Sequence, residues 1–154
     1  MMRTRSTIAR IALLAALTTG LAMLAPSPAT AATRTTRGRM LEATNASRWK
    51  NSVRRVDIHW TMSRQARKHS IAMANKGRIF HTTNPASFYL KGVRWSTWGE
   101  NVGVTDGTVR GLQRAFMKSP VHRANILNRG FRRVAVGTYR DGSGLLWVTV
   151  FFYG

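Results

Sequence analysis

The sequence contains no cysteine and little acid: five Asp and Glu stand against 25 Lys and Arg in 154 residues. Without cysteine the chain forms no disulfide and carries no lipid-modified cysteine of the lipoprotein kind. An exported domain without disulfides must be stabilised by its hydrophobic core. The shortage of acid gives a formal net charge of +20 at pH 7, and this charge influences which partners the protein attracts.

Long apolar runs are also lacking, and the most apolar stretch lies near the start of the chain. Three arginines precede apolar residues 11–25, and the small residues Ala29-Thr30-Ala31 follow. This layout is typical of a secretory signal peptide. An uncleaved membrane anchor is the alternative, but it needs about 20 apolar residues, and this run is shorter and interrupted at residues 18–20. We expect a signal peptide over residues 1–31, cleaved near Ala31 or Ala32, and a secreted, extracellular protein.

The chain after the expected signal is long enough for one domain and too short for two. Loss of the three signal-peptide arginines lowers the formal charge from +20 to +17. Such a charge favours anionic partners: envelope polymers that carry phosphate, lipid headgroups and, non-specifically, nucleic acid. The alternative is that arginine is simply the solubilising residue preferred in this lineage. We expect a monomer.

Helices are predicted from the spacing of apolar residues. Residues 32–39 show no such spacing and are interpreted as a disordered basic lead-in, which places the domain at residues 40–154. Apolar side chains three to four positions apart predict four helices, with Thr61 or Ser63 as a cap of the second. Their approximate ranges are 40–51, 63–75, 108–118 and 121–127.

The end of the chain has the period of a sheet. Residues 133–139 and 145–152 are rich in β-branched and aromatic side chains, and Asp141-Gly142-Ser143-Gly144 between them predicts an antiparallel hairpin. Both faces of this hairpin are apolar, so helices must cover each side. We therefore expect an α+β fold, a three-layer α-β-α sandwich with a small antiparallel central sheet. Residues 82–98 are predicted to be a long loop, and such loops are often functional.

Three short strings occur in a fixed order: Gly77-Arg78-Ile79-Phe80-His81, then Gly99-Glu100-Asn101-Val102, then SPVHRANIL over residues 119–127. Together they resemble the bacterial, SCP-like branch of the CAP superfamily (cysteine-rich secretory protein, antigen 5 and pathogenesis-related 1). SPVHRANIL is the most specific of the three. Segments 41–48, 66–73, 131–137 and 147–152 resemble the same family. The resemblance thus covers essentially the whole chain after the expected signal.

The resemblance implies that His81, Glu100 and His122 line the central cleft of the sandwich. Some relatives add a second carboxylate a few residues after the first histidine, but residues 82–87 read TTNPAS and contain no acid. Phe116 stands where such relatives commonly have Trp. Because the second carboxylate is missing, only three of the four cleft groups are present, which weakens the case for tight metal binding.

The three implied cleft residues are compatible with several kinds of chemistry. Two imidazoles and a carboxylate are a sufficient ligand set for a divalent metal, zinc or magnesium, with open coordination positions. They could instead share protons, or bind only one another and fix the surrounding elements. His122 is expected in the first turn of a helix, where the helix dipole disfavours imidazolium. Glu100 is expected to be ionised and to attract a cation, either a metal or an Arg. No residue is assigned a catalytic role with assurance.

Three other polar residues are interpreted as structural. His69 lies on an apolar helical stripe and is predicted to be a core histidine. Asn101 is predicted to be a turn residue and Ser119 a helix cap. His59 receives no role.

Three functions remain open on these residues. The preferred one is a binding module whose cleft, walled by Trp95, Trp98 and Phe116, holds a small apolar or lipid-like ligand or a component of the cell envelope. The association of CAP relatives with sterols and lipids supports it by analogy. The second is a hydrolase that uses the same cleft, with metal-bound water or a histidine as general base. The third is a polyanion-binding envelope protein with an inert cleft.

Overall fold

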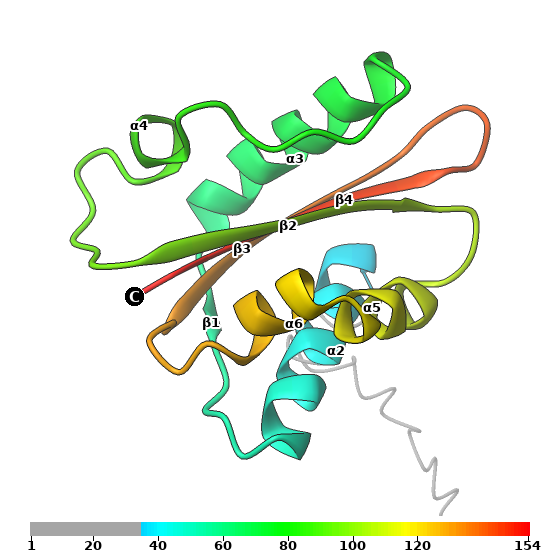
Figure 1. Cartoon of the computed structure of the whole chain (residues 1–154). Coiled ribbons are helices and arrows are strands. Elements are labelled where there is room, and N and C mark those ends of the chain that lie inside the picture. Colours follow the sequence, from blue (N-terminus) through cyan, green and yellow to red (C-terminus); the bar gives the residue numbers. More distant parts are fainter. Residues whose placement is uncertain (1–34) are drawn as a thin grey trace, which may run out of the picture.

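The computed structural model describes residues 35–154, in which one sheet lies between two layers of helices (Figure 1). The expected signal peptide and residues 32–34 lie outside this range. Within it, no helix combines the length and apolar character needed to cross a membrane. The elements, in chain order, are α2 (Thr36–Lys50), β1 (Asp57–Ile58), α3 (Trp60–Asn75), α4 (Pro85–Tyr89), β2 (Trp98–Thr105), α5 (Val109–Lys118), α6 (Pro120–Leu127), β3 (Arg133–Arg140) and β4 (Leu146–Tyr153).

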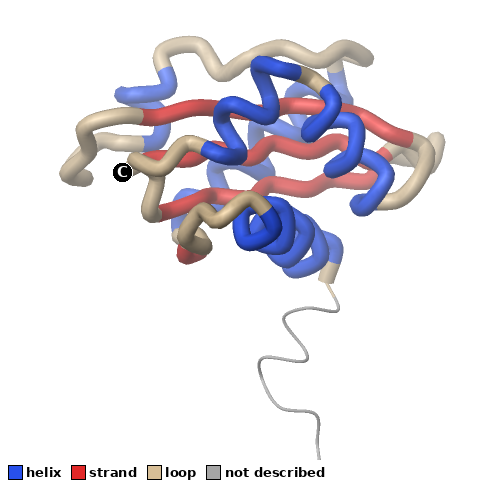
Figure 2. Tube along the Cα trace, turned by 60° about the horizontal axis from the view of Figure 1, so that its bottom comes forward, coloured by secondary structure: helices blue, strands red, loops and turns tan. Residues whose placement is uncertain are grey.

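The sheet has four strands in the order β1-β3-β4-β2. Strands β3 and β4 form the predicted hairpin, with Arg133 opposite Tyr153 and Arg140 opposite Leu146. Strand β2 pairs antiparallel with the other side of β4, while the two residues of β1 pair parallel with β3. The sheet is therefore mixed, antiparallel except at its short first strand, and β2 is an edge strand. Figure 2 shows the long strands side by side.

Strand β4 is buried along its whole length and contributes to the core on both faces of the sheet. Val148, Val150 and Phe152 pack in the cluster that includes residues of α2, α5 and α6. Phe151 and Tyr153 pack on the other face, in the cluster that includes residues of α3 and α4. Figure 1 shows the same division, with α3 and α4 on one side of the sheet and the other three helices on the opposite side. The predicted α-β-α sandwich is confirmed.

Three local predictions are wrong because capping and tertiary packing override the apolar pattern. The disordered lead-in does not extend to residue 39, since α2 begins at Thr36 and the side chain of Thr35 accepts a hydrogen bond from the Gly38 N–H at 2.9 Å. Helix α3 is capped neither by Thr61 nor by Ser63. His59 is its N-cap, and its Nδ1 accepts from the Met62 N–H at 3.1 Å.

The third difference concerns the long loop predicted over residues 82–98. It contains the short helix α4, which begins with a proline, a residue suited to the first helical position. The edge strand β2, which starts at the end of this stretch, was not predicted, because its glycines are unfavourable for a strand by propensity.

Arg48 is fully buried and has no acidic partner within residues 35–154. Its guanidinium donates instead to four backbone carbonyl oxygens, those of Arg54 at 2.7 Å, Ile126 at 2.7 Å, Asn128 at 3.0 Å and Phe131 at 3.2 Å. Burial lowers the pKa of Arg48, but an arginine titrates so far above neutral pH that it remains charged. This side chain joins the end of α2 to the end of α6.

Helix α3 approaches the sheet closely at Gly137 in β3. A Cβ at this position would lie 2.1 Å from the carbonyl carbon of Ala66 and 2.3 Å from the backbone nitrogen of Arg67. Because backbone cannot move aside like a flexible side chain, Gly137→Ala is expected to lower the free energy of unfolding by about 2 kcal/mol or more. Urea denaturation followed by circular dichroism measures the loss.

Gly142→Ala is the matched control, because a Cβ there meets no atom within 4 Å. We expect it to change stability by less than about 0.5 kcal/mol. Equal stabilities of the two variants would contradict the packing of α3 on β3.

Candidate functional site

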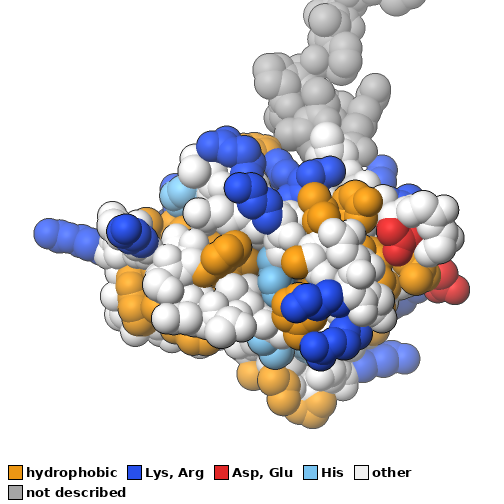
Figure 3. All heavy atoms as spheres, turned by 90° about the horizontal axis from the view of Figure 1, so that it is seen from above, with side chains coloured by type: hydrophobic (Ala, Val, Ile, Leu, Met, Phe, Trp, Pro, Cys, Tyr) orange, Lys and Arg blue, Asp and Glu red, His pale blue; other side chains and the backbone are white. Residues whose placement is uncertain are grey.

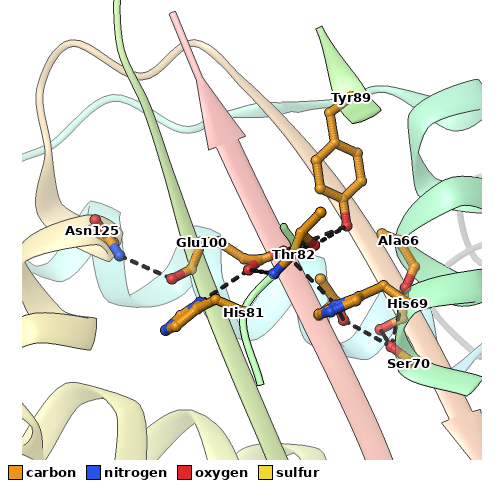
Figure 4. Close-up of polar contacts among 10 residues, drawn as sticks. Ala66, His69, Ser70, His81, Thr82, Tyr89, Glu100 and Asn125 are labelled. Atoms are coloured by element: carbon orange, nitrogen blue, oxygen red, sulfur yellow. Dashed lines mark hydrogen bonds and ion pairs between the residues drawn. The ribbon is translucent and has the colours of Figure 1, made fainter. Parts of the chain in front are cut away.

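The candidate site is built around Glu100, the one buried carboxylate among residues 35–154, which is 5% exposed. Strand β2 carries Glu100 on the face of the sheet that α3 and α4 cover. Figure 4 shows the carboxylate surrounded by Thr82, Tyr89 and His81, side chains of the loop and short helix that follow α3. Glu100 therefore links the edge strand to a segment about twenty residues earlier in the chain.

Hydrogen-bond donors occupy both oxygens of Glu100. Its Oε2 accepts from His81 Nδ1 and from the Thr82 N–H, each at 2.9 Å. Its Oε1 accepts from Thr82 Oγ1 at 2.6 Å and from the Tyr89 hydroxyl at 3.5 Å. A carboxylate has about four acceptor positions, so these donors fill it.

Histidines, and no arginine, lie beside the Glu100 carboxylate in the described residues. The basic side chains nearest to this carboxylate in the described part of the chain are His81, with Nδ1 at 2.9 Å, and His69, with Nδ1 at 3.8 Å. The expectation of an arginine partner is therefore wrong. A buried carboxylate in a strongly basic chain is satisfied here mainly by neutral donors.

His81 is bound to Glu100 through one ring nitrogen, while most of its side chain is exposed. A carboxylate only accepts hydrogen bonds, so His81 donates through Nδ1. In the neutral ring, Nε2 then keeps a free lone pair. The His81 side chain is 63% exposed. Viewed from the side of α3 and α4, histidine side chains reach the surface among apolar and basic groups (Figure 3). The site therefore exposes a ring nitrogen whose orientation is fixed by the hydrogen bond to the buried Glu100.

His122 lies near this pair without joining it. It is in the first turn of α6, and its Nδ1 is 2.9 Å from Ser119 Oγ. Burial lowers the pKa of His122, and the charge of His81 lowers it further. No hydrogen bond connects His122 to Glu100 in the described residues. The structure thus brings His81 and Glu100 into contact and places His122 within electrostatic range of His81.

The surroundings of His122 modify two predictions. Ser119 is the N-cap residue of α6 as expected, but its hydroxyl contacts His122 and does not cap a backbone N–H. Phe116 does not wall an open cleft, because it is 3% exposed and packs with its ring centre 4.9 Å from that of His122.

Asn101 attaches α6 to the opposite face of the same strand. It is buried within β2, so the predicted turn role is wrong. Its Nδ2 donates to the carbonyl oxygen of His122 at 3.0 Å, and its Oδ1 accepts from Asn125 Nδ2 at 2.9 Å. Asn125 also donates to the backbone oxygen of Glu100 at 3.2 Å (Figure 4). Because neighbouring strand residues point to opposite faces, Glu100 and Asn101 attach one strand to both helical layers.

His69 is a core histidine, as predicted, and it also extends the network beneath Glu100. It is 6% exposed, and its Nδ1 lies 3.2 Å from Thr149 Oγ1. Its ring meets Phe80 edge to face, and its Nε2 is buried with no hydrogen-bond partner. Burial lowers its pKa, the charge of Glu100 acts in the opposite direction, and His81 adds to the lowering. His69 is therefore neutral at physiological pH.

Sequence reasoning missed Thr82, Tyr89 and the link from His69. Thr82 directly follows His81, and its place in the segment where some relatives carry an acid was the available signal. Tyr89 and His69 gave no signal, because their contact with Glu100 depends on how α3 and α4 pack on the sheet.

The residues do not fit the predicted metal site. Among residues 35–154, no three His, Cys, Asp or Glu side chains are grouped so that they could hold a metal ion. Glu100 has no free acceptor position, and His81 uses Nδ1 to hold it. The arrangement of His81, Glu100 and His122 therefore gives no support to bound zinc or magnesium.

Comparisons with known proteins agree with this architecture. The family model described as "CAP: Cysteine-rich secretory protein family" matches residues 41–152. The protein YkwD of Bacillus subtilis (strain 168), described as uncharacterized, is 33% identical over 118 residues, which are 73% of this chain and 45% of YkwD. The chain thus spans less than half the length of that curated relative.

Two solved structures share the fold at low sequence identity. An outer surface protein from Borrelia burgdorferi superimposes with a TM-score of 0.69 at 16% identity, over 79% of this chain and 93% of that one. An extracellular protein containing a SCP domain, from Bacillus anthracis, superimposes with a TM-score of 0.64 at 22% identity, over 77% of this chain and 40% of that one.

Because the pKa of His69 is lowered in the folded state, we expect stability to depend on pH. The unfolded histidine titrates near pH 6.5 and binds the proton more tightly, so its contribution is complete above about pH 6.5 and is lost as the pH falls below it. His122 contributes with the same sign. Replacement of His69 by Gln should make the fall in melting temperature between pH 7.5 and 5 shallower without removing it. An unchanged pH profile in His69→Gln would contradict the neutral, buried state of His69.

Proposed function

Because this chain belongs to the cysteine-rich secretory protein (CAP) family, we propose that it is an extracellular binding module that takes a small ligand with an apolar or lipid-like part at the His81 face. The observation that carries this proposal is the state of the His81–Glu100 pair. The imidazole is 63% exposed, while the carboxylate that orients it is buried and has all its acceptor positions filled. The pair therefore exposes one ring nitrogen of His81 to which a ligand can bind.

The polar end of the ligand would bind to His81 Nε2, which accepts a hydrogen bond from a hydroxyl or N–H group. The ring is already fixed by the 2.9 Å bond from its Nδ1 to Glu100, so little side-chain entropy is lost on binding. Glu100 itself would not contact the ligand, because it is buried and fully used. A neutral ligand head therefore suits this site better than a cation.

The apolar part of the ligand is suggested by a row of contacting aromatic rings beside the carboxylate, of which Phe88 meets Tyr89 edge to face and the others are stacked. Ring centres are 4.8 Å apart for Phe88 and Tyr89, 4.1 Å for Tyr89 and Phe151, and 5.9 Å for Phe151 and Trp98. The two outer rings are exposed, Phe88 by 40% and Trp98 by 39%, while the two inner rings are buried. Trp95 nearby in the chain is 43% exposed. This row of rings supports an apolar contact surface that is connected to Glu100 through the Tyr89 hydroxyl.

An extracellular location is supported by the expected signal peptide and by the descriptions of two structural neighbours. One of these proteins is described as an outer surface protein and the other as extracellular. A ligand from the cell envelope would be accessible to a protein in this location.

A second candidate function is metal-free acid–base catalysis, favoured by the direction of the His81 hydrogen bond. A histidine that donates through Nδ1 to a carboxylate has a basic Nε2 that can take a proton from water or a hydroxyl. Such a reaction would be insensitive to chelators and would be abolished by Glu100→Gln. Turnover that a chelator stops would contradict this candidate.

The binding proposal is tested by quenching of intrinsic tryptophan fluorescence with a panel of fatty acids, sterols and phospholipid monomers. At least one ligand should bind. His81→Ala should lower the affinity for that ligand about tenfold, because one hydrogen bond in a preorganised site is lost. Arg110→Ala, an exposed substitution on α5, is the control and should bind as tightly as the unmodified protein. Failure of the whole panel with folded protein, or equal affinities for His81→Ala and the control, would overturn the proposal.

A further inference from the structure

A second candidate site lies on the other side of the sheet from α3 and α4, where α2 ends. A cavity of about 330 Å³ opens there, lined by Trp49, Ser52, Val53 and Arg54. None of its lining residues belongs to the His81 site. Trp49 is 70% exposed, an unusually open position for so large an apolar side chain.

The charge around this cavity is positive. The segment from Arg48 to Arg55 contains four basic residues and no acidic one. Lys50, Arg54 and Arg55 are exposed, and none of them forms an ion pair with a carboxylate within residues 35–154. The Arg55 guanidinium lies over the Trp49 ring at 5.9 Å from its centre. An aromatic ring and guanidinium groups without a carboxylate partner therefore lie together on this surface.

The loop that carries these groups is held rigidly from below. The Asn51 and Val53 N–H groups both donate to the Arg48 carbonyl oxygen, at 3.0 and 2.9 Å. The buried Arg48 side chain donates from Nε to the Arg54 carbonyl at 2.7 Å. Ser52 adopts the left-handed conformation, with φ of 56°, and the buried Val53 anchors the turn. The backbone of this loop is therefore fixed before a ligand arrives, which lowers the entropy cost of binding.

We propose that this cavity binds one phosphate-bearing polyol or sugar unit of an anionic polymer. The planar guanidinium groups of Arg54 and Arg55 match a phosphate group, which takes paired N–H donors from arginine. The exposed Trp49 ring packs against the carbon face of the adjoining polyol or sugar. A cavity of about 330 Å³ suits one such unit.

A phospholipid membrane carries the same phosphate chemistry but suits this surface less well. Attachment to a bilayer through an interface depends on several apolar side chains that enter the headgroup region together. In the segment from Arg48 to Arg55, Trp49 is the one exposed large apolar residue, because Val53 is buried. We therefore assign the site to the phosphate of an anionic polymer and not to that of a lipid headgroup.

Titration calorimetry of the purified protein with poly(glycerol phosphate), inorganic phosphate and phosphatidylglycerol vesicles tests the proposal. The polymer should bind, inorganic phosphate should bind more weakly because it lacks the carbon unit, and the vesicles should bind no better than inorganic phosphate. Trp49→Ala and the double variant Arg54→Ala/Arg55→Ala should each weaken polymer binding about tenfold or more.

Charge alone is controlled by Arg64→Ala/Lys68→Ala, which removes two exposed cations from α3 across the sheet. This control should weaken polymer binding less than about threefold, because it reduces only the long-range electrostatic attraction between the protein and the polymer. Equal losses in the two double variants would show that net charge suffices and would overturn the site. Vesicle binding without polymer binding, or no binding of any probe by folded protein, would overturn it as well. His81→Ala should leave polymer binding unchanged, which separates this inference from the function proposed for the His81 face.

Discussion

The arrangement of the whole site depends on the hydrogen bonds that satisfy one buried carboxylate, Glu100. Glu100 accepts from His81, from the backbone and hydroxyl of Thr82 and from Tyr89, and each of these contacts removes a cost of burying charge. The loop after α3, the short helix α4 and the edge strand β2 are fixed together as a result. The same contacts orient His81 outward, so the stability of the site and its chemistry have a common origin.

The two faces of the sheet carry different buried charged residues and different exposed surfaces. On the α3 and α4 side, the neutral and buried His69 lies beneath Glu100, and aromatic rings connect the carboxylate to exposed Phe88 and Trp98. On the opposite side, buried Arg48 satisfies four backbone carbonyls and holds the loop that presents Trp49 and Arg54. A buried acid organises one surface and a buried base organises the other.

The sandwich could be predicted because a hairpin with two apolar faces requires helices on both sides. The family resemblance implied that His81 and Glu100 line one cleft, and the structure shows them in contact. Strand β2 could not be predicted from propensity, since its glycines serve the approach of other elements: a Cβ on Gly103 would lie 3.0 Å from Leu112 and Phe116. The roles of Asn101 and His69 depend on the faces that β2 and α3 present after packing. The metal prediction did not anticipate that Thr82 and Tyr89 would occupy the oxygens of Glu100.

The central claim is that Glu100 holds the Nδ1 proton of His81 and leaves Nε2 free. Long-range ¹H–¹⁵N correlation spectra of the imidazole rings in ¹⁵N-labelled protein, recorded where His81 is neutral, report this directly. The account predicts that His81 is protonated at Nδ1, with the ¹⁵N shift of Nε2 typical of an unprotonated ring nitrogen. A neutral His81 protonated at Nε2 would contradict it.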